Sequence, residues 1–424
     1  MTLPVPYVFA DAGAFVLVAL FTEVLRRIAL RRRLMDRPGQ GKAHRSPTPY
    51  LGGVAIVAGT LAAAVIAAPP RDPRVLTLIV AGTVIAVLGL VDDIKPLGVS
   101  VRLATEGLAA VLVVASGTRV DIFGYMPVIG RWPDIIITLL WIVLMTNSFN
   151  LLDNSDGAAG GIAMVTGAAL AALAFGTGWE SIGILQLALS AGCAGFLVHN
   201  WAPARIFMGD AGSLFLGFVM SVSAVLIFTS PGSSASGTSW IARVCGLLLL
   251  TFVAAVDTCT VIVSRHRAGL PLVRGGTDHA AHRLRVLGLG TSQAAVLLSG
   301  GAGLSCTFGL LVTFGVVPAA GSLAVTLALG IVLVVLAQRV RVAAPATTRT
   351  TPPPASSTSP TAATPPSACA PSALPSIVLP PTSKPGARSP VKAVAVGPPS
   401  ANTAEPFKPP PAPSPSPIAT QLHE

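Results

Sequence analysis

Long apolar runs alternate with short polar segments along the first 340 or so residues of the chain. A helix needs about 17 to 25 mainly apolar residues to cross the hydrocarbon core of a bilayer. Eleven runs reach roughly that length, at 7–28, 51–68, 75–91, 101–116, 134–150, 158–175, 181–198, 211–229, 240–263, 292–317 and 320–338. The pattern predicts an all-α fold, a polytopic integral membrane helical bundle of about eleven transmembrane helices.

Five of the polar segments concentrate amides, carboxylates and basic side chains. They read GQGKAHRSPTP, VDDIKP, NSFNLLDNSDG, HNWAPARIFMGD and RGGTDHAAHRL. If the chain starts outside the membrane, all five segments follow odd-numbered helices and fall on the inner side. We therefore expect one composite site built from five loops.

The cations favour the same orientation. Under this topology sixteen Lys or Arg residues lie in inner loops, and five lie outside, namely Arg71, Arg74, Arg119, Arg131 and Arg243. Cytoplasmic loops of membrane proteins carry such an excess of Lys and Arg. We therefore predict an N-terminus outside, with the site and the C-terminus in the cytoplasm.

Composition excludes a soluble globular protein. Apolar residues make up 52% of the 424 positions and charged residues 11%, and the mean hydropathy is +0.73. The net charge of +11 is explained by the cytoplasmic loops and the tail, so no nucleic-acid partner is expected. The five cysteines form no closely spaced metal-binding pair and are expected to be free thiols.

The chain changes character near residue 340. Twenty-two of the 37 prolines follow Arg341, interspersed with Ser, Thr and Ala. Such a segment buries too little apolar surface to offset the entropy of ordering it. We expect a transmembrane catalytic domain at 1–340 and a Pro/Ser/Ala-rich disordered cytoplasmic tail at 341–424. The tail is either passive or a ligand for a partner domain.

The segment NSFNLLDNSDG follows an apolar run directly. An Asp at a helix centre costs roughly 2.5 to 3.5 kcal/mol on insertion scales, so polar groups at membrane depth tend to mark function. If the stretch is helical, Asn150, Asp153 and Asp156 share a face that could receive a metal ion or a nucleotide. The alternative is a loop whose side chains cap backbone ends.

Two adjacent carboxylates, Asp92 and Asp93, end the third run. The helix dipole and their mutual repulsion disfavour this arrangement, so a cation or a general-base role would account for it. Lys95 could hold a phosphate oxygen. The alternative is a solvated pair at the start of a loop.

Asp210 opens the eighth run beside glycines that permit close approach of a ligand, and Phe207 offers a surface on which a base could stack. An ordinary N-cap is the alternative for this Asp.

His279 and His282 lie in a basic loop with Arg283, where imidazoles can donate to phosphates. Neither Cys nor a second His pair completes a zinc site there.

Carboxylates on three loops and basic groups on two, beside a bilayer, indicate phosphoryl transfer at the membrane surface. Mg²⁺ held by Asp side chains would bridge a diphosphate while basic side chains stabilise the transferring charge. The position beside the membrane implies that one substrate is a lipid.

These motifs, in this order, resemble the polyprenyl-phosphate N-acetylhexosamine-1-phosphate transferase family (glycosyltransferase family 4). The resemblance runs through MDRPGQGKAHRSPTPYLGG, GLVDDIKPL, NSFNLLDNSDGAAGG, NWAPARIFMGDAGSLFLG and GGTDHAAHRL. It implies an enzyme of the bacterial plasma membrane that moves a sugar 1-phosphate from a UDP-N-acetylhexosamine onto polyprenyl phosphate. The reaction releases UMP and uses Mg²⁺, with Mn²⁺ as the alternative ion. A homodimer and a partner of the tail are further candidates.

The resemblance also assigns roles. It implies catalytic roles for Asp92, Asp93, Asp153, Asp156 and His279, and metal binding by Asp210 and Asp153. It points to Asn150, Asp153, Asp156, Asn200, Phe207, His279, His282 and Arg283 as nucleotide or sugar-phosphate contacts, and less firmly to Lys42, His44 and Lys95.

The chain resembles most closely the branch that uses UDP-GlcNAc with undecaprenyl phosphate. The alternative branch is the peptidoglycan phospho-MurNAc-pentapeptide translocase, which resembles this chain less because it carries three consecutive histidines where this chain reads DHAAHRL.

A membrane transporter is the alternative of another class, motivated by Glu23, Glu106 and Asp257 within apolar runs. For Asp257 we expect packing against a basic partner. Direct attack by the lipid phosphate is favoured over a covalent Asp intermediate.

Overall fold

The computed structural model describes residues 5–36, 47–123, 130–228, 239–271 and 276–340. The predictions for Lys42, for His44 and for the tail at 341–424 lie outside the described residues.

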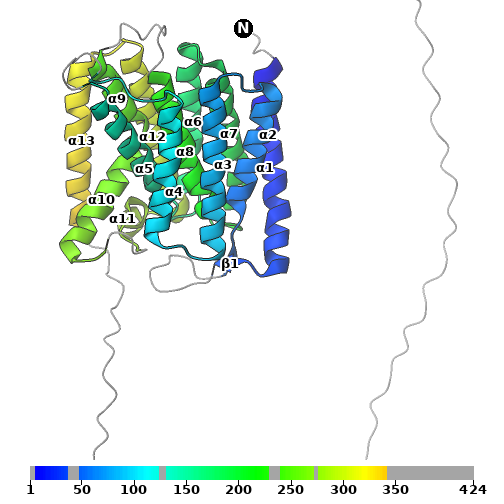
Figure 1. Ribbon diagram of the computed structural model, residues 1–424. Coiled ribbons are helices and arrows are strands. Elements are labelled where there is room, and N and C mark those ends of the chain that lie inside the picture. The colour runs from blue at the N-terminus through cyan, green and yellow to red at the C-terminus, as the bar shows by residue number, and fades with distance from the viewer. Residues whose placement is uncertain (1–4, 37–46, 124–129, 229–238, 272–275, 341–424) are drawn as a thin grey trace, which may run out of the picture. The chain divides into compact units, whose positions relative to one another are not determined.

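The described residues form thirteen helices and one pair of short antiparallel strands (Figure 1). In order they are α1 (Val5–Arg32), β1 (Met35–Asp36), β2 (Thr48–Pro49), α2 (Gly52–Ala67), α3 (Pro73–Ile94), α4 (Val99–Ala115), α5 (Trp132–Leu152), α6 (Ala158–Gly176), α7 (Glu180–Asn200), α8 (Gly209–Phe228), α9 (Trp240–Leu250), α10 (Phe252–Ala268), α11 (Ala280–Val286), α12 (Thr291–Thr313) and α13 (Ala319–Arg339). The predicted all-α class is confirmed.

Each of the eleven predicted runs corresponds to a helix, except that the ninth is a bent pair. α9 and α10 meet at Thr251 at an angle of 72°. By length and composition, eight of the described helices can cross a membrane, or nine if the bent pair counts as one span. α2 and α4, with 16 and 17 residues, are about 24 to 26 Å long at 1.5 Å per residue. The count of eleven spans therefore stays a prediction.

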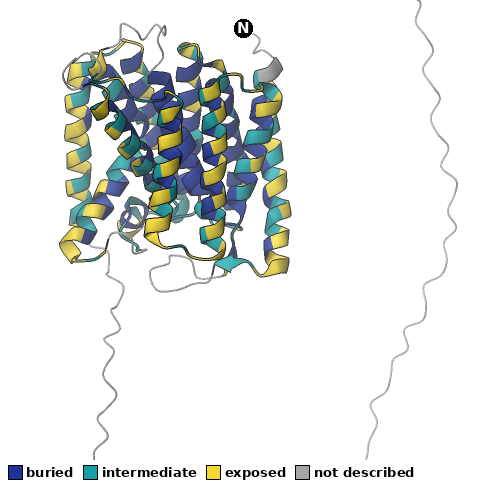
Figure 2. Ribbon diagram, viewed as in Figure 1, coloured by how far each residue is buried: buried dark blue, intermediate teal, exposed yellow. Residues whose placement is uncertain are grey.

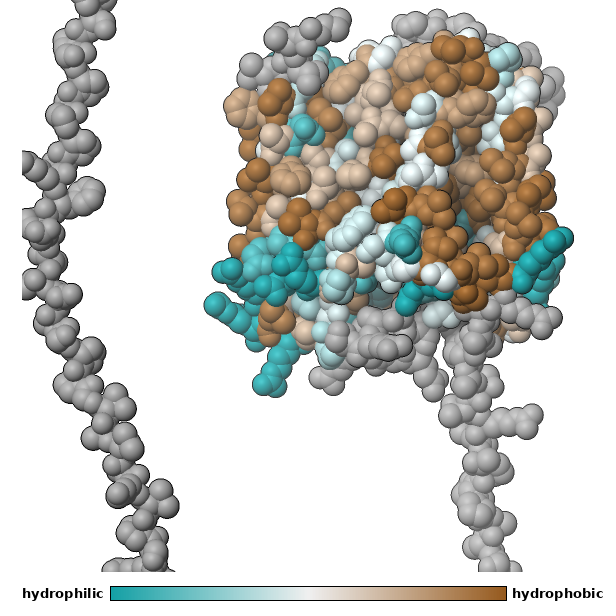
Figure 3. Space-filling model, turned by 180° about the vertical axis from the view of Figure 1, so that it is seen from behind, coloured by the Kyte–Doolittle hydropathy of each residue, from teal (hydrophilic) through white to brown (hydrophobic). Residues whose placement is uncertain are grey.

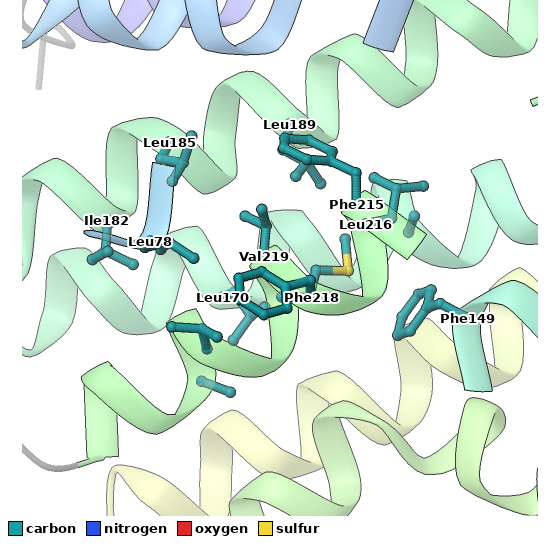
Figure 4. Close-up of a cluster of buried hydrophobic side chains, with 14 of the residues drawn as sticks. Leu78, Phe149, Leu170, Ile182, Leu185, Leu189, Phe215, Leu216, Phe218 and Val219 are labelled. Carbon is teal, nitrogen blue, oxygen red and sulfur yellow. The ribbon is translucent and has the colours of Figure 1, made fainter. Parts of the chain in front are cut away.

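α8 forms the centre of the bundle. Every residue in an 18-residue apolar stretch of this helix is buried, and the helix packs against α3, α5, α2 and α6. Figure 4 shows Phe215, Phe218 and Val219 of this helix among side chains of its neighbours, including Leu78, Leu170, Ile182, Leu185 and Leu189. The apolar residues on every side of α8 are thus covered by other helices of the bundle.

The peripheral helices expose apolar side chains. In an 18-residue apolar stretch of α13 only 11% of the residues are buried, and Val325 and Ile331 are 60% and 65% exposed. Figure 2 shows the exposed residues along the outer helices and the buried ones inside. The sides in Figure 3 are largely hydrophobic, and hydrophilic residues gather at the lower end. This distribution fits a protein whose sides contact lipid.

The polar end of the bundle is closed by backbone pairing between distant segments. The Phe207 carbonyl accepts from Gly52 N at 3.0 Å, and the Met208 carbonyl accepts from Gly53 N at 2.8 Å. A Cβ atom on Gly53 would lie 2.1 Å from the Gly212 nitrogen, so only glycine lets α2 approach α8 this closely. The contact fixes the start of α8, where the polar clusters meet.

Candidate active site

A cavity of about 1090 Å³ lies at the polar end of the bundle, where α11 and the strand pair are found (Figure 1). Four of the five polar clusters contribute lining residues, and Asp36 and Tyr50 flank the first cluster. The structure thus brings the separate segments to one place. The predicted site residues that line the cavity are Asp93, Asn150, Asp153, Asp156, Asn200, Phe207, Asp210, His279 and His282.

Two carboxylates hold the N-terminus of α8. The Asp93 oxygens accept from the backbone nitrogens of Asp210 at 2.9 Å and Ala211 at 3.2 Å. Asp153, which follows α5, accepts a backbone hydrogen bond from Gly209. The first amides of a helix have no partner within it and carry partial positive charge. The central helix therefore positions both carboxylates at the cavity.

Gly209 makes this arrangement possible. Its φ is +71°, in the left-handed region, and a Cβ atom there would lie 2.6 Å from an Asp93 carboxylate oxygen. Any other residue would add both backbone strain and a steric clash. The glycine-rich start of the eighth run is thereby explained by close approach within the protein itself.

Arg102 of α4 joins three of the predicted site residues. One guanidinium nitrogen donates to Asp92 at 2.9 Å and to Asp210 at 3.2 Å, and the other donates to Asn150 at 3.1 Å. Asn150 in turn donates to Asp210 at 2.8 Å and to Ser213 at 2.9 Å. The guanidinium holds the carboxylates in fixed directions and offsets part of their charge.

Sequence reasoning had counted Arg102 only as one of the inner cations. Its position in the first turn of an apolar run, nine residues after Asp93, was the signal that could have singled it out. Asn147, Thr258, Arg265 and Arg285 also line the cavity and were not assigned to the site.

Asn200 and Asp156 connect two of the loops. The Asn200 side chain accepts from Gly157 N at 3.0 Å and donates to the Ile206 carbonyl at 2.9 Å. Asp156 accepts from Ala204 N at 3.0 Å. Asn200 and Asp156 line the cavity, and their hydrogen bonds to backbone atoms also hold the two loops together.

The loop before α11 supplies the basic wall. The guanidinium of Arg265 donates to both Asp278 oxygens, at 2.9 and 3.1 Å. Burial favours a higher pKa for Asp278, but these hydrogen bonds hold the pKa below its usual value. His279 Nδ1 lies 3.0 Å from a carboxylate oxygen of Asp257. The charge on the loop is therefore already partly paired within the protein.

The two histidines differ. Burial, together with the nearby His279 and Arg285, lowers the pKa of His282 to about 4. The lowered pKa favours a neutral His282 near pH 7, and a neutral imidazole can still donate to a phosphate through its one N–H, so the predicted contact stays a prediction. Of these two histidines, His279 is the one with a carboxylate partner among the described residues.

A second wall of the cavity is apolar. It consists of side chains from α4, α5 and α10, several of them exposed on the side of the bundle, and includes Val99, Leu103, Leu140, Leu144 and Ile262. The cavity thus has a charged wall and a wall continuous with the lipid-facing surface.

The remaining predicted residues do not line the cavity. Asp92 is turned toward Arg102, with its side chain 8% exposed. Arg283 donates to the carbonyls of Asp278, Ala337 and Val340, so its placement gives it a structural role at the end of α13, not the predicted contact with diphosphate or sugar. Lys95 is exposed just after α3.

The carboxylates repel one another. Burial first, and then the charges of Asp210, Asp93 and Asp156, raise the pKa of Asp153 to about 7. No three His, Cys, Asp or Glu side chains among the described residues already form a metal-binding group. Mg²⁺ needs only one or two carboxylates, because it keeps waters and takes substrate phosphates as its other ligands. The hard oxygen donors of this cavity fit that requirement.

Lipid-facing sides, and a charged cavity at one end of the bundle, define a multi-pass membrane protein that can bind a polar ligand at one end. The model of the family described as glycosyl transferase family 4 matches residues 75–228. A Streptomyces coelicolor protein named as a glycosyltransferase is 38% identical over 299 residues, covering 69% of this chain and 66% of that protein.

Two further relatives have more specific names. A Bacillus subtilis protein named as an undecaprenyl-phosphate N-acetylglucosaminyl 1-phosphate transferase is 31% identical over 66% of this chain and 78% of its own length. A Mycobacterium leprae decaprenyl-phosphate N-acetylglucosaminephosphotransferase is 29% identical over 67% of this chain and 78% of its own. The chain belongs to glycosyl transferase family 4.

Proposed function

We propose that the protein transfers N-acetylglucosamine 1-phosphate from UDP-N-acetylglucosamine to a polyprenyl phosphate, releasing UMP. The observation that carries the proposal is the cavity with two unlike walls. Its carboxylates, Arg102, Arg285 and His279 suit a charged diphosphate substrate. Its apolar wall, continuous with the lipid-facing side, suits the hydrocarbon chain of an acceptor.

The reaction joins the two substrates at the boundary between these walls. An oxygen of the lipid phosphate attacks the phosphorus that bears the sugar, and the bond from that phosphorus to the oxygen bridging to the uridylate breaks. UMP leaves with that oxygen, and the lipid becomes a polyprenyl diphosphate carrying the sugar. No covalent enzyme intermediate is required, because positioning and charge stabilisation suffice for phosphoryl transfer.

The residues divide this task by position. Asp93 is the member of the acidic pair that faces the cavity, and its carboxylate is held by the amides of α8. We assign Asp93 to orienting the acceptor phosphate and accepting its proton. Asn150, Asp156, Asn200 and Phe207 lie on the loops proposed to bind the nucleotide, and His279 donates to phosphate oxygens.

We propose Mg²⁺ as the metal ion, held by Asp210 and Asp153. The raised pKa of Asp153 supports the proposal, because crowded buried carboxylates are stabilised by a divalent cation. When bound, the ion would neutralise charge on the diphosphate.

The names of the relatives support N-acetylglucosamine over other sugars, because two of them are named for it. The cell membrane of a bacterium is the proposed location, with the cavity on the cytoplasmic side where soluble UDP-sugars are made. The excess of Lys and Arg in the loops at that end supports this orientation.

The proposal is tested by measuring UMP release by the purified protein with undecaprenyl phosphate and Mg²⁺. UDP-N-acetylglucosamine, UDP-N-acetylgalactosamine and UDP-MurNAc-pentapeptide are compared. We expect UMP from the first and little from the last. UMP from the pentapeptide substrate alone would assign the chain to the translocase reaction. No UMP from any of the three would refute the proposal.

A further inference from the structure

Asp257 lies in α10, five residues into the helix that begins after the bend at Thr251. It is 1% exposed, although it stands in an apolar run. Such a carboxylate is costly to bury unless it is fully hydrogen-bonded. After the bend, α10 runs toward the polar end of the bundle, where α11 lies (Figure 1). The Asp257 carboxylate contacts the residues at the start of α11.

Both Asp257 oxygens have partners at this point. One accepts from His279 Nδ1 at 3.0 Å, and the other accepts from the backbone nitrogen of Ala280 at 2.6 Å. An ionised carboxylate can only accept, so the proton of the neutral imidazole must lie on Nδ1. The second hydrogen bond prevents the carboxylate from turning away from the ring.

This contact determines which edge of the imidazole a ligand meets. His279 lines the cavity and is itself 3% exposed, so its ring is confined by its surroundings. Because His279 Nδ1 is hydrogen-bonded to Asp257, the ring nitrogen that a ligand in the cavity can reach is Nε2. A phosphate oxygen at Nε2 favours the protonated ring, and the carboxylate at Nδ1 stabilises the same form.

We propose that Asp257 is a positioning residue that orients His279 and stabilises its imidazolium form, so that Nε2–H donates to a phosphate oxygen of the substrates. The inference rests on the proposed function for the identity of the ligand. The Asp257–His279 contact explains a buried carboxylate that none of the five polar clusters contains.

A role in holding the loop alone does not explain the geometry. Arg265 and Asp278 already join α10 to the loop through two hydrogen bonds, and Arg283 joins α11 to the end of α13. Neither of these contacts reaches the ring of His279. Asp257 is the carboxylate that bonds to a cavity-lining imidazole in the described part of the chain.

The other charged and titratable groups near the pair must be considered in any pH measurement. On the same side of the cavity they are Arg265, Asp278, His282, Arg283 and Arg285. The other charged residues that line the cavity are Asp36, Asp93, Arg102, Asp153, Asp156 and Asp210.

The first test compares Asp257→Asn with wild type in the UMP-release assay across pH. Asn has the same shape but no charge. We expect kcat/KM to fall by about 10- to 100-fold, as for other residues that orient a site ligand. The alkaline limb of the pH profile, identified as the limb that His279→Gln removes, should move to lower pH, because the negative charge beside the ring is lost. Unchanged limbs would overturn the proposal.

Two control variants separate orientation from folding. Asp257→Glu keeps the charge and should retain the alkaline limb, even if the longer side chain lowers kcat. Asp278 is next to His279 in sequence, but its carboxylate binds Arg265 and not the imidazole. Asp278→Asn should therefore move the alkaline limb of the pH profile less than Asp257→Asn does. Equal shifts in Asp257→Asn and Asp278→Asn would mean that only the general negative charge matters, which contradicts the proposal.

A double-mutant cycle provides the second test. If Asp257 acts through His279, then Asp257→Asn should change kcat/KM little in a His279→Gln background. A full additional loss in that background would show an independent structural role and overturn the proposal.

A third readout needs no substrate. Nitrogen NMR of labelled histidine in detergent, assigned with His279→Gln, should show the proton of neutral His279 on Nδ1 in the wild type and a smaller share of that tautomer in Asp257→Asn. If this signature is present but no UDP-sugar yields UMP, the proposed function fails while the pairing stands. If UMP is released and the signature is absent, the inference alone fails.

Discussion

Arg102 offers the sharpest prediction about the arrangement of the site. Its guanidinium donates to Asp92, Asp210 and Asn150, and its side chain is 20% exposed. A hydrogen bond to a charged group contributes about 1.5 to 3 kcal/mol, so the two bonds to carboxylates amount to roughly 3 to 6 kcal/mol. Because the side chain is partly exposed, solvent screening reduces the contribution of these two hydrogen bonds to about 2 to 4 kcal/mol.

At about 1.4 kcal/mol for each tenfold change, Arg102→Met should lower kcat/KM by roughly 30- to 1,000-fold. Arg102→Lys keeps the charge but cannot reach three acceptors from one planar fork, so its loss should be intermediate. The assay is UMP release under saturating Mg²⁺. Arg131→Lys is the control, because Arg131 is an exposed residue just before α5. Wild-type kcat/KM in Arg102→Met would refute the role given to this residue.

Three further predictions follow from the site. Gly209→Ala should reduce both activity and the thermal midpoint. Gly178 also has a positive φ, +84°, but a Cβ atom there would have no neighbour within 4 Å, so Gly178→Ala should carry the backbone strain of about 1 to 2 kcal/mol without loss of activity. His282 has a pKa of about 4 against 6.5 unfolded, so its contribution to stability is present above pH 6.5 and lost as pH falls to 4. The loss is about 3 kcal/mol, and His282→Gln should remove that part of the acid sensitivity of the thermal midpoint. Asp210→Asn should weaken Mg²⁺ binding, measured by calorimetry, by at least tenfold; unchanged Mg²⁺ affinity would exclude Asp210 as a ligand.

The sequence predicted the helices well because apolar run length is a direct measure of what a bilayer can accommodate. The sequence could not predict the break at Thr251, since neither Pro nor Gly stands at residues 250–252 and the bend depends on packing. The lengths of α2 and α4 likewise depend on where neighbouring segments turn. Run length therefore locates helices more reliably than it counts membrane crossings.

The convergence of the clusters was predictable from topology, because alternate helix ends must lie at the same side of a bundle. The partners of each side chain were not. Asp93 and Asp153 were expected to face ligand, and the structure shows that they also hold the amides of α8. Arg283 was expected at the ligand but bonds to carbonyls at the end of α13. Such contacts join residues far apart in the chain, and no local spacing encodes them.

The central claim is that the phosphate bearing the sugar moves to the lipid. It is tested most directly with UDP-N-acetylglucosamine radiolabelled in its β-phosphate, incubated with the protein, Mg²⁺ and undecaprenyl phosphate. We predict label in the solvent-extractable lipid together with unlabelled UMP, and loss of both products in Asp210→Asn. Label that stays in the aqueous phase, as N-acetylglucosamine 1-phosphate or as intact substrate, would contradict the account.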